Sequence, residues 1–330
     1  MVPKIVVGVD ISKLTLDIAV IVGNSPIKTV KIANSEEDIR KFLDLLKDEY
    51  RFKNREIIFC AEHMGLFASF LTKIVLKRKI PFYLESPLRI KRSLGIQRGK
   101  NDQLDAIRIA QYAKKNYQSM RLWQPPRLCL ENLKTLLSIR KRLIKTKKIL
   151  STPLKDNLYF LGKYDRKYQE DLFLPSIGSI LNDIKMVEKE MKRLINHDEK
   201  LCHLMSLVTS VPRIGNIVGI QMIVYTNEFL NIECPKKFAS YCGVAPFEWK
   251  SGTSIKGRTK ISHLANKDLK TNLHMAAIGF AALPKTNLGK YYLRKVDEGK
   301  NKQSVINAIR NKLIHRVFSC VKNQQPYKDL

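Results

Sequence analysis

Short apolar runs alternate with polar turn residues at the start of the chain. Runs at residues 4–10 and 14–22, separated by a tight turn, predict two neighbouring strands, and a run at 27–33 predicts a third. Ser35 begins a variant of the helix N-cap pattern, so we expect a helix that ends near Tyr50. The chain is therefore expected to open with three antiparallel strands and a helix.

The next stretch alternates between strand and helix patterns. A buried strand is predicted at 55–62, followed by a helix at 66–78 and a strand at 80–84. After a basic connection, the stretch GKNDQLDAIRIAQYA at 99–113 has weak helical spacing of its apolar residues. Three antiparallel strands followed by alternating helix and strand indicate an α/β domain. This order matches the ribonuclease H-like arrangement, which we expect for residues 1–120.

Beyond residue 120, apolar residues recur with helical spacing over longer stretches. Two prolines in RLWQPPRL, at 121–128, mark a boundary. The stretches 128–158 and 165–196 predict two helices packed as a hairpin, so residues 121–198 are expected to form a linker and a helical coiled-coil arm. The basic run IRKRLIKTKKIL is either a solvated face or a contact to a phosphate backbone. In the second case the contacts would include Arg140, Lys141 and Arg142.

The last part of the chain, residues 199–330, is expected to be a mainly α-helical domain. SLVTSVPRIGNIVGIQMIVY predicts two helices joined by a turn, similar to a helix-hairpin-helix whose turn amides can meet a DNA phosphate. Arg213 replaces the first glycine of that turn, which leaves simple packing as the alternative. FEWKSGTSIKGRTKIS, at 247–262, predicts a loop or a short hairpin. Amphipathic helices are expected at 267–282, 288–297 and 303–321.

The charge balance points to a polyanionic partner. The chain has 60 Lys and Arg against 30 Asp and Glu, a formal net charge of +30, and the excess is spread along the whole sequence. Nucleic acid is the leading candidate, and an acidic membrane surface is the rival. The apolar runs are too short or too interrupted to span a bilayer, and no signal-peptide pattern opens the chain, so we expect a soluble, cytoplasmic protein. The six cysteines show no zinc-ligand spacing.

The scarce carboxylates are placed in a way that predicts a metal site. Asp10 ends the first predicted strand and Glu62 ends the strand at 55–62, while Asp102 and Asp105 share one face of a helix. In a ribonuclease H-like sheet the two strand ends are adjacent and the helix crosses beside them. Four converging carboxylates would repel one another, whereas two Mg²⁺ ions about 3.5 to 4 Å apart would neutralise them and clamp a phosphate.

Alternatives remain open for the same residues. The helical acids can instead form a salt bridge with an ordinary cation, namely Arg98, Lys100 or Arg108. Asp17 lies within the second predicted strand and is expected at an edge or facing solvent. GVDISKLTLDIAV also resembles the first phosphate loop of actin-like and sugar-kinase ATPases. That class is excluded because no second Asp-Gly phosphate motif and no glycine-rich adenosine motif follow.

Four stretches together carry a resemblance that covers nearly the full length of the chain. They are GVDISK, AEHMGLF, RGKNDQLDAIRIAQYA and ASYCGVAPFEWKSGTSIKGRTKIS. In this combination the chain resembles the DEDD transposases of insertion sequences, which are bridge-RNA-guided recombinases with a RuvC-like domain and are related to the pilin-gene invertases. The resemblance implies a RuvC-like catalytic domain, a coiled-coil arm and a C-terminal transposase domain.

The resemblance also implies roles for particular residues. Asp10, Glu62, Asp102 and Asp105 match the metal-binding acids of the family, and Ser251 matches its nucleophilic serine. Such an enzyme would use Mg²⁺, form a covalent phosphoserine link to DNA and pass the strand to a partner DNA. A structured non-coding RNA would guide it, and a homo-oligomer, a dimer or tetramer, would let the acids of one subunit complete the serine site of another. Candidate nucleic-acid contacts beyond the arm are Arg98, Lys100, Lys250, Lys256 and Arg258.

The chain departs from the family pattern at three places, and two rival functions remain. Ala265 stands where glycine is usual, Lys270 stands where arginine is usual, and PRIG replaces the commoner PGIG. The first rival is a junction-resolving nuclease of the same fold that uses water as nucleophile, which would make Ser251 incidental. The second is a nucleic-acid-binding protein without catalytic activity.

Overall fold

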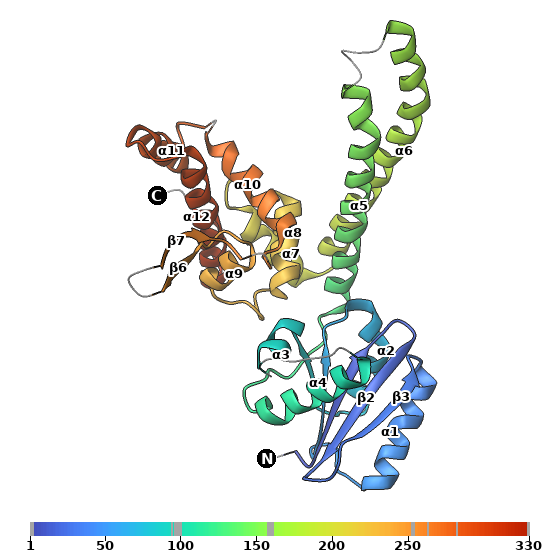
Figure 1. Cartoon of the computed structure of the whole chain (residues 1–330). Helices are drawn as coiled ribbons and strands as arrows, with labels where there is room; N and C mark the ends of the chain where they lie inside the picture. The colour runs from blue at the N-terminus through green and yellow to red at the C-terminus, as the bar shows by residue number, and fades with distance from the viewer. Residues whose placement is uncertain are drawn as a thin grey trace. The chain divides into compact units, whose positions relative to one another are not determined.

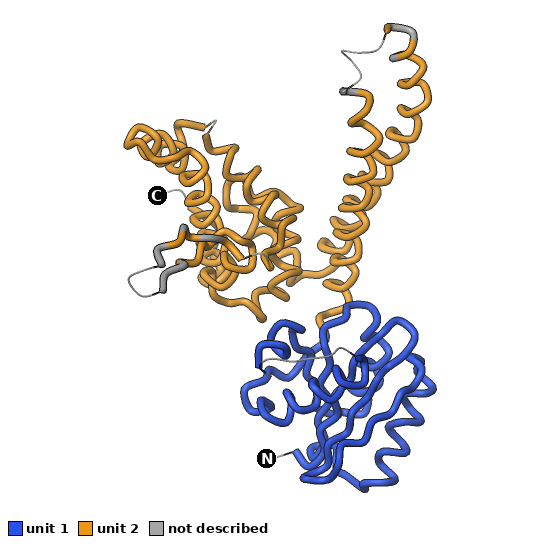
Figure 2. Tube along the Cα trace, in the orientation of Figure 1, with its two compact units in different colours: residues 1–125 blue, residues 126–330 orange. Residues whose placement is uncertain are grey.

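The chain divides into two compact units. The computed structural model describes residues 3–93, 95, 101–156, 162–251, 255–262, 264–281 and 283–328. Unit 1 comprises Met1–Pro125 and unit 2 comprises Pro126–Leu330, as Figure 2 shows. We describe each unit by itself. The separation of an arm from a third domain within unit 2 remains a prediction.

Unit 1 is built on a five-stranded sheet with the order β3-β2-β1-β4-β5 (Figure 1). Its strands are β1 (Ile5–Ile11), β2 (Thr15–Val22), β3 (Lys28–Ala33), β4 (Ile57–Glu62) and β5 (Phe82–Glu85). The first three are antiparallel because short turns join them, whereas β4 and β5 run parallel to β1 after helical crossovers. The sheet confirms the predicted ribonuclease H-like arrangement.

Helices cover both faces of this sheet because its central strands are apolar on both sides. One face packs Val7 and Val9 against α1 (Glu36–Tyr50) and α2 (Ser69–Lys77), which follows the 3₁₀ helix η1 (Gly65–Ala68). The opposite face, which includes Val6, packs against α3 and α4. These helices span Pro87–Ser93 and Asp102–Asn116. The predicted N-cap is confirmed, since the Ser35 Oγ accepts a hydrogen bond from the Asp38 amide.

Unit 2 combines a long helical hairpin with a helical core. The helices α5 (Leu128–Asp156) and α6 (Lys163–Asn196) pack against each other as predicted (Figure 1). The other helices are α7 (Glu199–Thr209), α8 (Asn216–Thr226), α9 (Pro235–Tyr241), α10 (Lys267–Ala281), α11 (Asn287–Asp297) and α12 (Lys302–Asn323). Residues 247–262, predicted as a loop or short hairpin, contain the paired strands β6 (Phe247–Ser251) and β7 (Ile255–Lys260).

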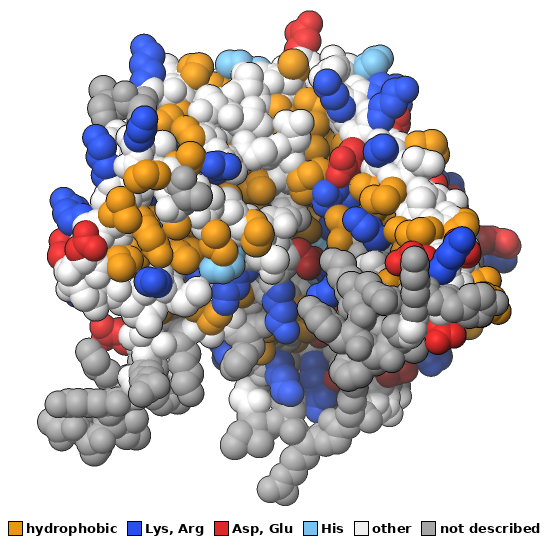
Figure 3. Space-filling view, turned by 90° about the horizontal axis from the view of Figure 1, so that it is seen from above, with side chains coloured by type: hydrophobic (Ala, Val, Ile, Leu, Met, Phe, Trp, Pro, Cys, Tyr) orange, Lys and Arg blue, Asp and Glu red, His pale blue; other side chains and the backbone are white. Residues whose placement is uncertain are grey.

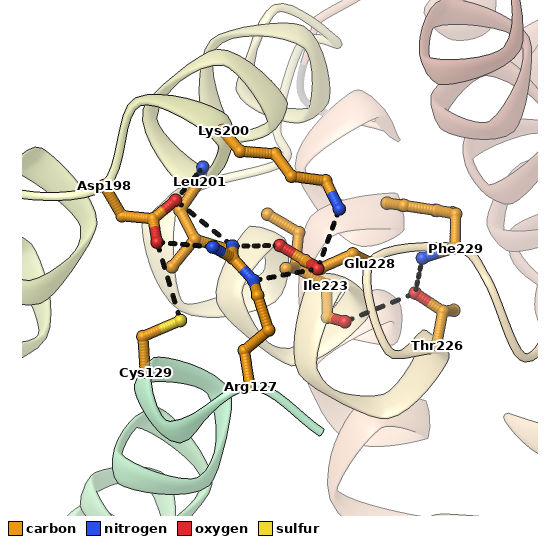
Figure 4. Close-up of polar contacts among 9 residues, drawn as sticks. All are labelled: Arg127, Cys129, Asp198, Lys200, Leu201, Ile223, Thr226, Glu228 and Phe229. Carbon is orange, nitrogen blue, oxygen red and sulfur yellow. Dashed lines mark hydrogen bonds and ion pairs between the residues drawn. The ribbon is translucent and has the colours of Figure 1, made fainter. Parts of the chain in front are cut away.

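A network of ion pairs holds the N-terminal end of α5 in place within unit 2 (Figure 4). Arg127, one residue before α5, donates through Nη1 to Asp198 at 2.6 Å and through Nε to Glu228 at 3.2 Å. The Lys200 ammonium donates to the same Glu228 carboxylate at 3.0 Å. The Glu228 side chain is only 2% exposed, and these two cations stabilise its buried charge. The network joins the start of the arm to α7 and to the turn after α8.

Three details differ from the sequence expectations. The strand expected at 80–84 is Phe82–Glu85, and part of the expected basic connection after it forms α3. The short helix α9 was not predicted. Arg213 adopts a positive φ of 68°, so the PRIG turn keeps a glycine-like backbone, and its guanidinium lies over Gly279 of α10. No helix in the described ranges is long and apolar enough to cross a membrane.

Candidate active site

Two acids lie side by side at the carboxyl ends of adjacent parallel strands. The register of β1 and β4 pairs Gly8 with Cys60 and Val9 with Ala61, which brings Asp10 and Glu62 to the same level one residue further on. Side chains alternate across a strand, so Asp10 shares a face with Gly8, and Glu62 shares that face with Cys60. Parallel neighbours at one level are about 5 Å apart. The structure therefore places both acids on the face that α4 covers.

Helix α4 crosses this face at very close range. A Cβ atom at Gly8 would lie 2.5 Å from the Ala106 carbonyl oxygen and 2.7 Å from the Ala110 Cα, so only glycine allows this approach. Asp102 and Asp105 lie in the first turn of α4, just before Ala106. The contact at Gly8 therefore brings the N-terminal turn of α4 towards Asp10, which lies two residues beyond Gly8.

The electrostatics of Asp10 reflect the neighbouring acids of α4 and β2. The pKa of Asp10 is raised to about 6, chiefly by burial and then by the negative charges of Asp102, Asp105 and Asp17, in that order. A carboxylate among like charges favours its protonated form. The repulsion indicates a concentration of negative charge that a bound cation would relieve.

Asp17 was expected at an edge or facing solvent, and that expectation is wrong. The strand β2 lies between β3 and β1, and Asp17 is 7% exposed on the face that packs against α4. It lies directly opposite Asp10 on one side and opposite Lys31 on the other, and the Lys31 ammonium is 3.2 Å from its carboxylate. The period-two alternation with buried Ala19 and Ile21 was a signal that could have located it.

Glu85 is a further buried acid in the same row, and sequence reasoning missed it. It lies opposite Glu62 in the register of β4 and β5, is 6% exposed and pairs with Arg89 of α3 at 3.2 Å. One row across the sheet thus contains four acids between two cations. From β3 to β5 the row consists of Lys31, Asp17, Asp10, Glu62 and Glu85, and Arg89 of α3 pairs with Glu85.

The helical acids differ in their partners. The Asp105 carboxylate pairs with Arg108 at 2.6 Å, which is one of the alternatives that the sequence left open, whereas Asp102 is exposed. No group of three or more His, Cys, Asp or Glu side chains among the described residues is arranged to hold a metal ion. The donor set nevertheless fits a hard divalent cation such as Mg²⁺, because it consists of carboxylate oxygens around an Asp10 whose pKa is raised by burial and by nearby negative charge.

The proposed nucleophile lies in unit 2 on the β6–β7 hairpin. Ser251 is the last residue of β6, and its backbone pairs with Ile255 of β7. The structure describes the backbone but not the side chains of Lys250, Ser251, Lys256 and Arg258. Arg98 and Lys100, two candidate contacts to nucleic acid, lie outside the described residues. The chemical roles of these residues remain predictions.

The basic residues predicted on the arm have different surroundings. Arg140 pairs with Glu188 of α6 and Lys141 with Asp268 of α10, each at 2.6 Å, while Arg142 is exposed. In Figure 3, Lys and Arg side chains are spread widely over the face shown and outnumber the Asp and Glu side chains. The positive charge on this face is thus distributed, and binding to nucleic acid remains a prediction for Arg140, Lys141 and Arg142.

The fold of unit 1 and the placement of its acids together indicate a class of protein. Unit 1 is a ribonuclease H-like domain with acids gathered at the carboxyl ends of its central strands. Two family models match the chain: a model of the DEDD transposases of IS110 type matches residues 7–160, and "Transposase IS116/IS110/IS902 family" matches residues 205–293. Together they cover well over half of the sequence. The chain therefore belongs to the IS110-type transposases, a family of DNA recombination enzymes.

Individual relatives match parts of both units. The pilin gene-inverting protein of Moraxella bovis is 26% identical over 329 residues, covering 98% of each chain. The transposase for insertion sequence element IS1111A of Coxiella burnetii is 23% identical and covers 76% of this chain and 73% of its own. Among solved structures, Thermus thermophilus RuvC matches with a TM-score of 0.27 at 13% identity, over 36% of this chain and 99% of RuvC.

Proposed function

We propose that this transposase cuts and rejoins DNA strands through a covalent link to Ser251, assisted by a metal-binding acidic cluster in unit 1. The observation that carries the proposal is the electrostatic cluster of Asp10, Asp102 and Asp105, with Glu62 level with Asp10 in the sheet. Membership of the family supports it, because the two family models match the regions that contain the acids and the serine.

The cluster is proposed to bind Mg²⁺, with two ions in each site. Asp10 and Glu62 would hold the ions from the strand ends, and Asp102 and Asp105 from the first turn of α4. Bound there, the ions would stabilise negative charge on a phosphate and on the oxygens that enter and leave it. The raised pKa of Asp10 supports this role, because a bound cation would favour the ionised carboxylate over its protonated form.

The proposed reaction makes one bond to phosphorus and breaks another. The Ser251 hydroxyl loses its proton, its oxygen bonds to a DNA phosphate, and the sugar oxygen of the broken bond leaves and takes up a proton. A hydroxyl of the partner DNA strand then attacks the phosphoserine, which returns the serine oxygen and seals the new junction. Lys250 and Lys256, neighbours of the serine in the sequence, are proposed to stabilise charge on the phosphate.

Donor and target DNA, a guide RNA and further copies of this chain are the proposed partners. The name of the Moraxella relatives indicates inversion of a pilin gene, which is a recombination of the same chemical kind. Guidance by a structured RNA rests on the family resemblance, and the excess of 30 positive charges supports binding of two nucleic acids. Because the acids and Ser251 belong to different units, a dimer or tetramer could complete each site between subunits.

Removal of one proposed metal ligand tests the role of the acids. Asp102→Asn and Glu62→Gln should each reduce Mg²⁺-dependent strand cleavage by roughly a hundredfold or more, because charge on the phosphate is no longer stabilised. Cleavage is measured on DNA that contains the ends of the element, with the co-purified RNA present. DNA affinity, measured by fluorescence anisotropy, should stay close to that of the wild type.

A matched control removes an exposed acid elsewhere in unit 1. Asp44 lies on α1 and pairs with Arg78, so Asp44→Asn should leave cleavage unchanged. Cleavage at the wild-type rate by Asp102→Asn or Glu62→Gln would exclude the acidic cluster from the reaction.

A further inference from the structure

Unit 2 contains a cluster of three basic side chains on two helices that pack together. Lys270 and His274 lie one turn apart on α10, and Arg310 lies on α12. Arg310 is only 8% exposed, and its Nε atom is shielded from solvent with no hydrogen-bond partner among the described residues. A buried guanidinium is normally paired with a carboxylate or with several acceptors. Arg310 is thus more than nine-tenths buried while part of its binding capacity is unused.

The two neighbours of Arg310 do not compensate its charge. The Nδ1 atom of His274 is also buried without a partner among the described residues. Burial lowers the pKa of Lys270 and of His274, and the nearby positive charge of Arg310 lowers both further. Burial also lowers the pKa of Arg310. Three groups that can carry positive charge therefore lie near one another, and none of them forms an ion pair with a carboxylate of the described residues.

The cluster adjoins the backbone that leads into β6. The Lys270 Cδ atom lies 3.7 Å from the position that a Cβ atom would take on Gly243. Asn307, one turn before Arg310 on α12, donates a hydrogen bond to the Val244 carbonyl at 2.9 Å. Both contacts fall on the turn just before β6, the strand that ends at Ser251. The cluster and the serine hairpin thus belong to one continuous part of unit 2.

We propose that Arg310, His274 and Lys270 bind a backbone phosphate of the DNA strand that the enzyme cuts. Phosphate oxygens accept hydrogen bonds from guanidinium, imidazole N–H and ammonium groups, and a phosphate would supply negative charge to this cluster. The choice of DNA rests on the proposed function, because the cluster lies beside the turn that leads into β6, the strand that ends at Ser251. This proposed phosphate site is separate from the acidic cluster, whose residues belong to unit 1.

The variant Arg310→Met distinguishes a role of Arg310 in phosphate binding from a purely structural role. Methionine fills a similar volume without charge, so the melting temperature should stay level or rise, because an unpaired buried charge is removed. The affinity for duplex DNA should fall about tenfold or more, as expected for loss of a charged hydrogen bond. The slope of log affinity against log salt should decrease by about 0.9, the value for one phosphate contact.

A matched control removes an exposed cation from the same helix. Lys322→Gln, in the last turn of α12, should leave the salt slope and the melting temperature close to those of the wild type. A fall in the melting temperature of Arg310→Met with an unchanged salt slope would overturn the proposal, because it would identify Arg310 as a purely structural residue.

Two further measurements identify the ligand. Inorganic phosphate, compared with chloride at equal ionic strength, should raise the melting temperature of the wild type more than that of Arg310→Met. Equal shifts in both proteins would overturn the proposal. Repeating the salt titration with RNA of the same length separates the two nucleic acids, since a change in slope with RNA and none with DNA would contradict the assignment to DNA. None of these readouts requires cleavage, so they remain valid if Ser251 is not the nucleophile.

Discussion

Asp10 is the residue on which the acidic cluster depends. It lies between Asp17 in the antiparallel neighbour strand and the level of Glu62 in the parallel one, while α4 brings two more acids to the same face. Lys31 pairs with Asp17 and Arg89 pairs with Glu85, so each end of the row lies beside a cation. At Asp10, burial and the neighbouring negative charges disfavour the ionised carboxylate, so a cation bound there would be stabilising.

The raised pKa of Asp10 predicts a pH-dependent stability in the metal-free protein. The folded state holds this proton up to a pH of about 6, whereas the unfolded chain loses it near 3.8. The free energy of unfolding therefore falls as the pH rises between these values and stays lower above them. Asp10→Asn removes the effect and should stabilise the metal-free protein by about 2 kcal/mol at pH 8, and much less near pH 4, in urea unfolding.

Two comparisons check this prediction at the same residue. Mg²⁺ should raise the stability of the wild type at pH 8 and have little effect on Asp10→Asn, because the variant lacks both the repulsion and the ligand. Asp44 has a pKa lowered by its hydrogen bond to Arg78, so Asp44→Asn should show no gain at high pH. A loss of stability in Asp10→Asn at pH 8 would show that Asp10 is compensated by a partner in the folded state.

At the scale of elements, the contact between β1 and α4 assembles the site. Strand β1 supplies Asp10, helix α4 supplies Asp102 and Asp105, and the two meet where Gly8 faces Ala106 and Ala110. Two small helical residues four positions apart lie on one face and allow the backbones to approach. The contact at Gly8, two residues before Asp10, therefore sets the distance between β1 and α4.

The variant Gly8→Ala tests this contact. Its methyl group would meet the backbone of α4, so α4 must shift, and unit 1 should lose about 1 to 3 kcal/mol in urea unfolding. Cleavage should fall more than DNA affinity, because the acids of α4 move away from Asp10. Gly178→Ala on α6, where an added methyl meets nothing within 4 Å, is the control and should be neutral or slightly stabilising. Full cleavage activity in Gly8→Ala would show that the position of α4 does not matter.

Local patterns in the sequence were enough to predict the order of the strands and of helices α1, α2 and α4 in unit 1, but not α3. Apolar runs and turns located the five strands, and the strand ends then located Asp10 and Glu62. The orientation of Asp17 could have been inferred from alternation, but the pairing with Lys31 depends on the register of two strands. The burial of Arg310 could not be predicted, because Lys and Arg occur throughout the basic amphipathic helices and only tertiary packing separates buried from exposed ones.

At the scale of the whole molecule, the residues of the proposed reaction are divided between two units. The acids belong to unit 1, while Ser251 and the basic cluster of α10 and α12 belong to unit 2. The arm formed by α5 and α6 begins at the Arg127 network, which fixes its base within unit 2. The proposed reaction therefore requires the two units, from one subunit or from two, to meet on one DNA phosphate.

Trapping of the covalent intermediate tests the proposed reaction most directly. A DNA substrate nicked beside the cleavage position releases its broken end, so the reverse reaction is lost and protein should remain bonded to DNA. Trypsin cleaves after Lys250 and Lys256, and mass spectrometry of the peptide SGTSIK should place the phosphate link on Ser251. The adduct should be absent from Ser251→Ala. Cleavage by Ser251→Ala, with no adduct on any residue, would contradict the serine reaction and identify a nuclease that uses water.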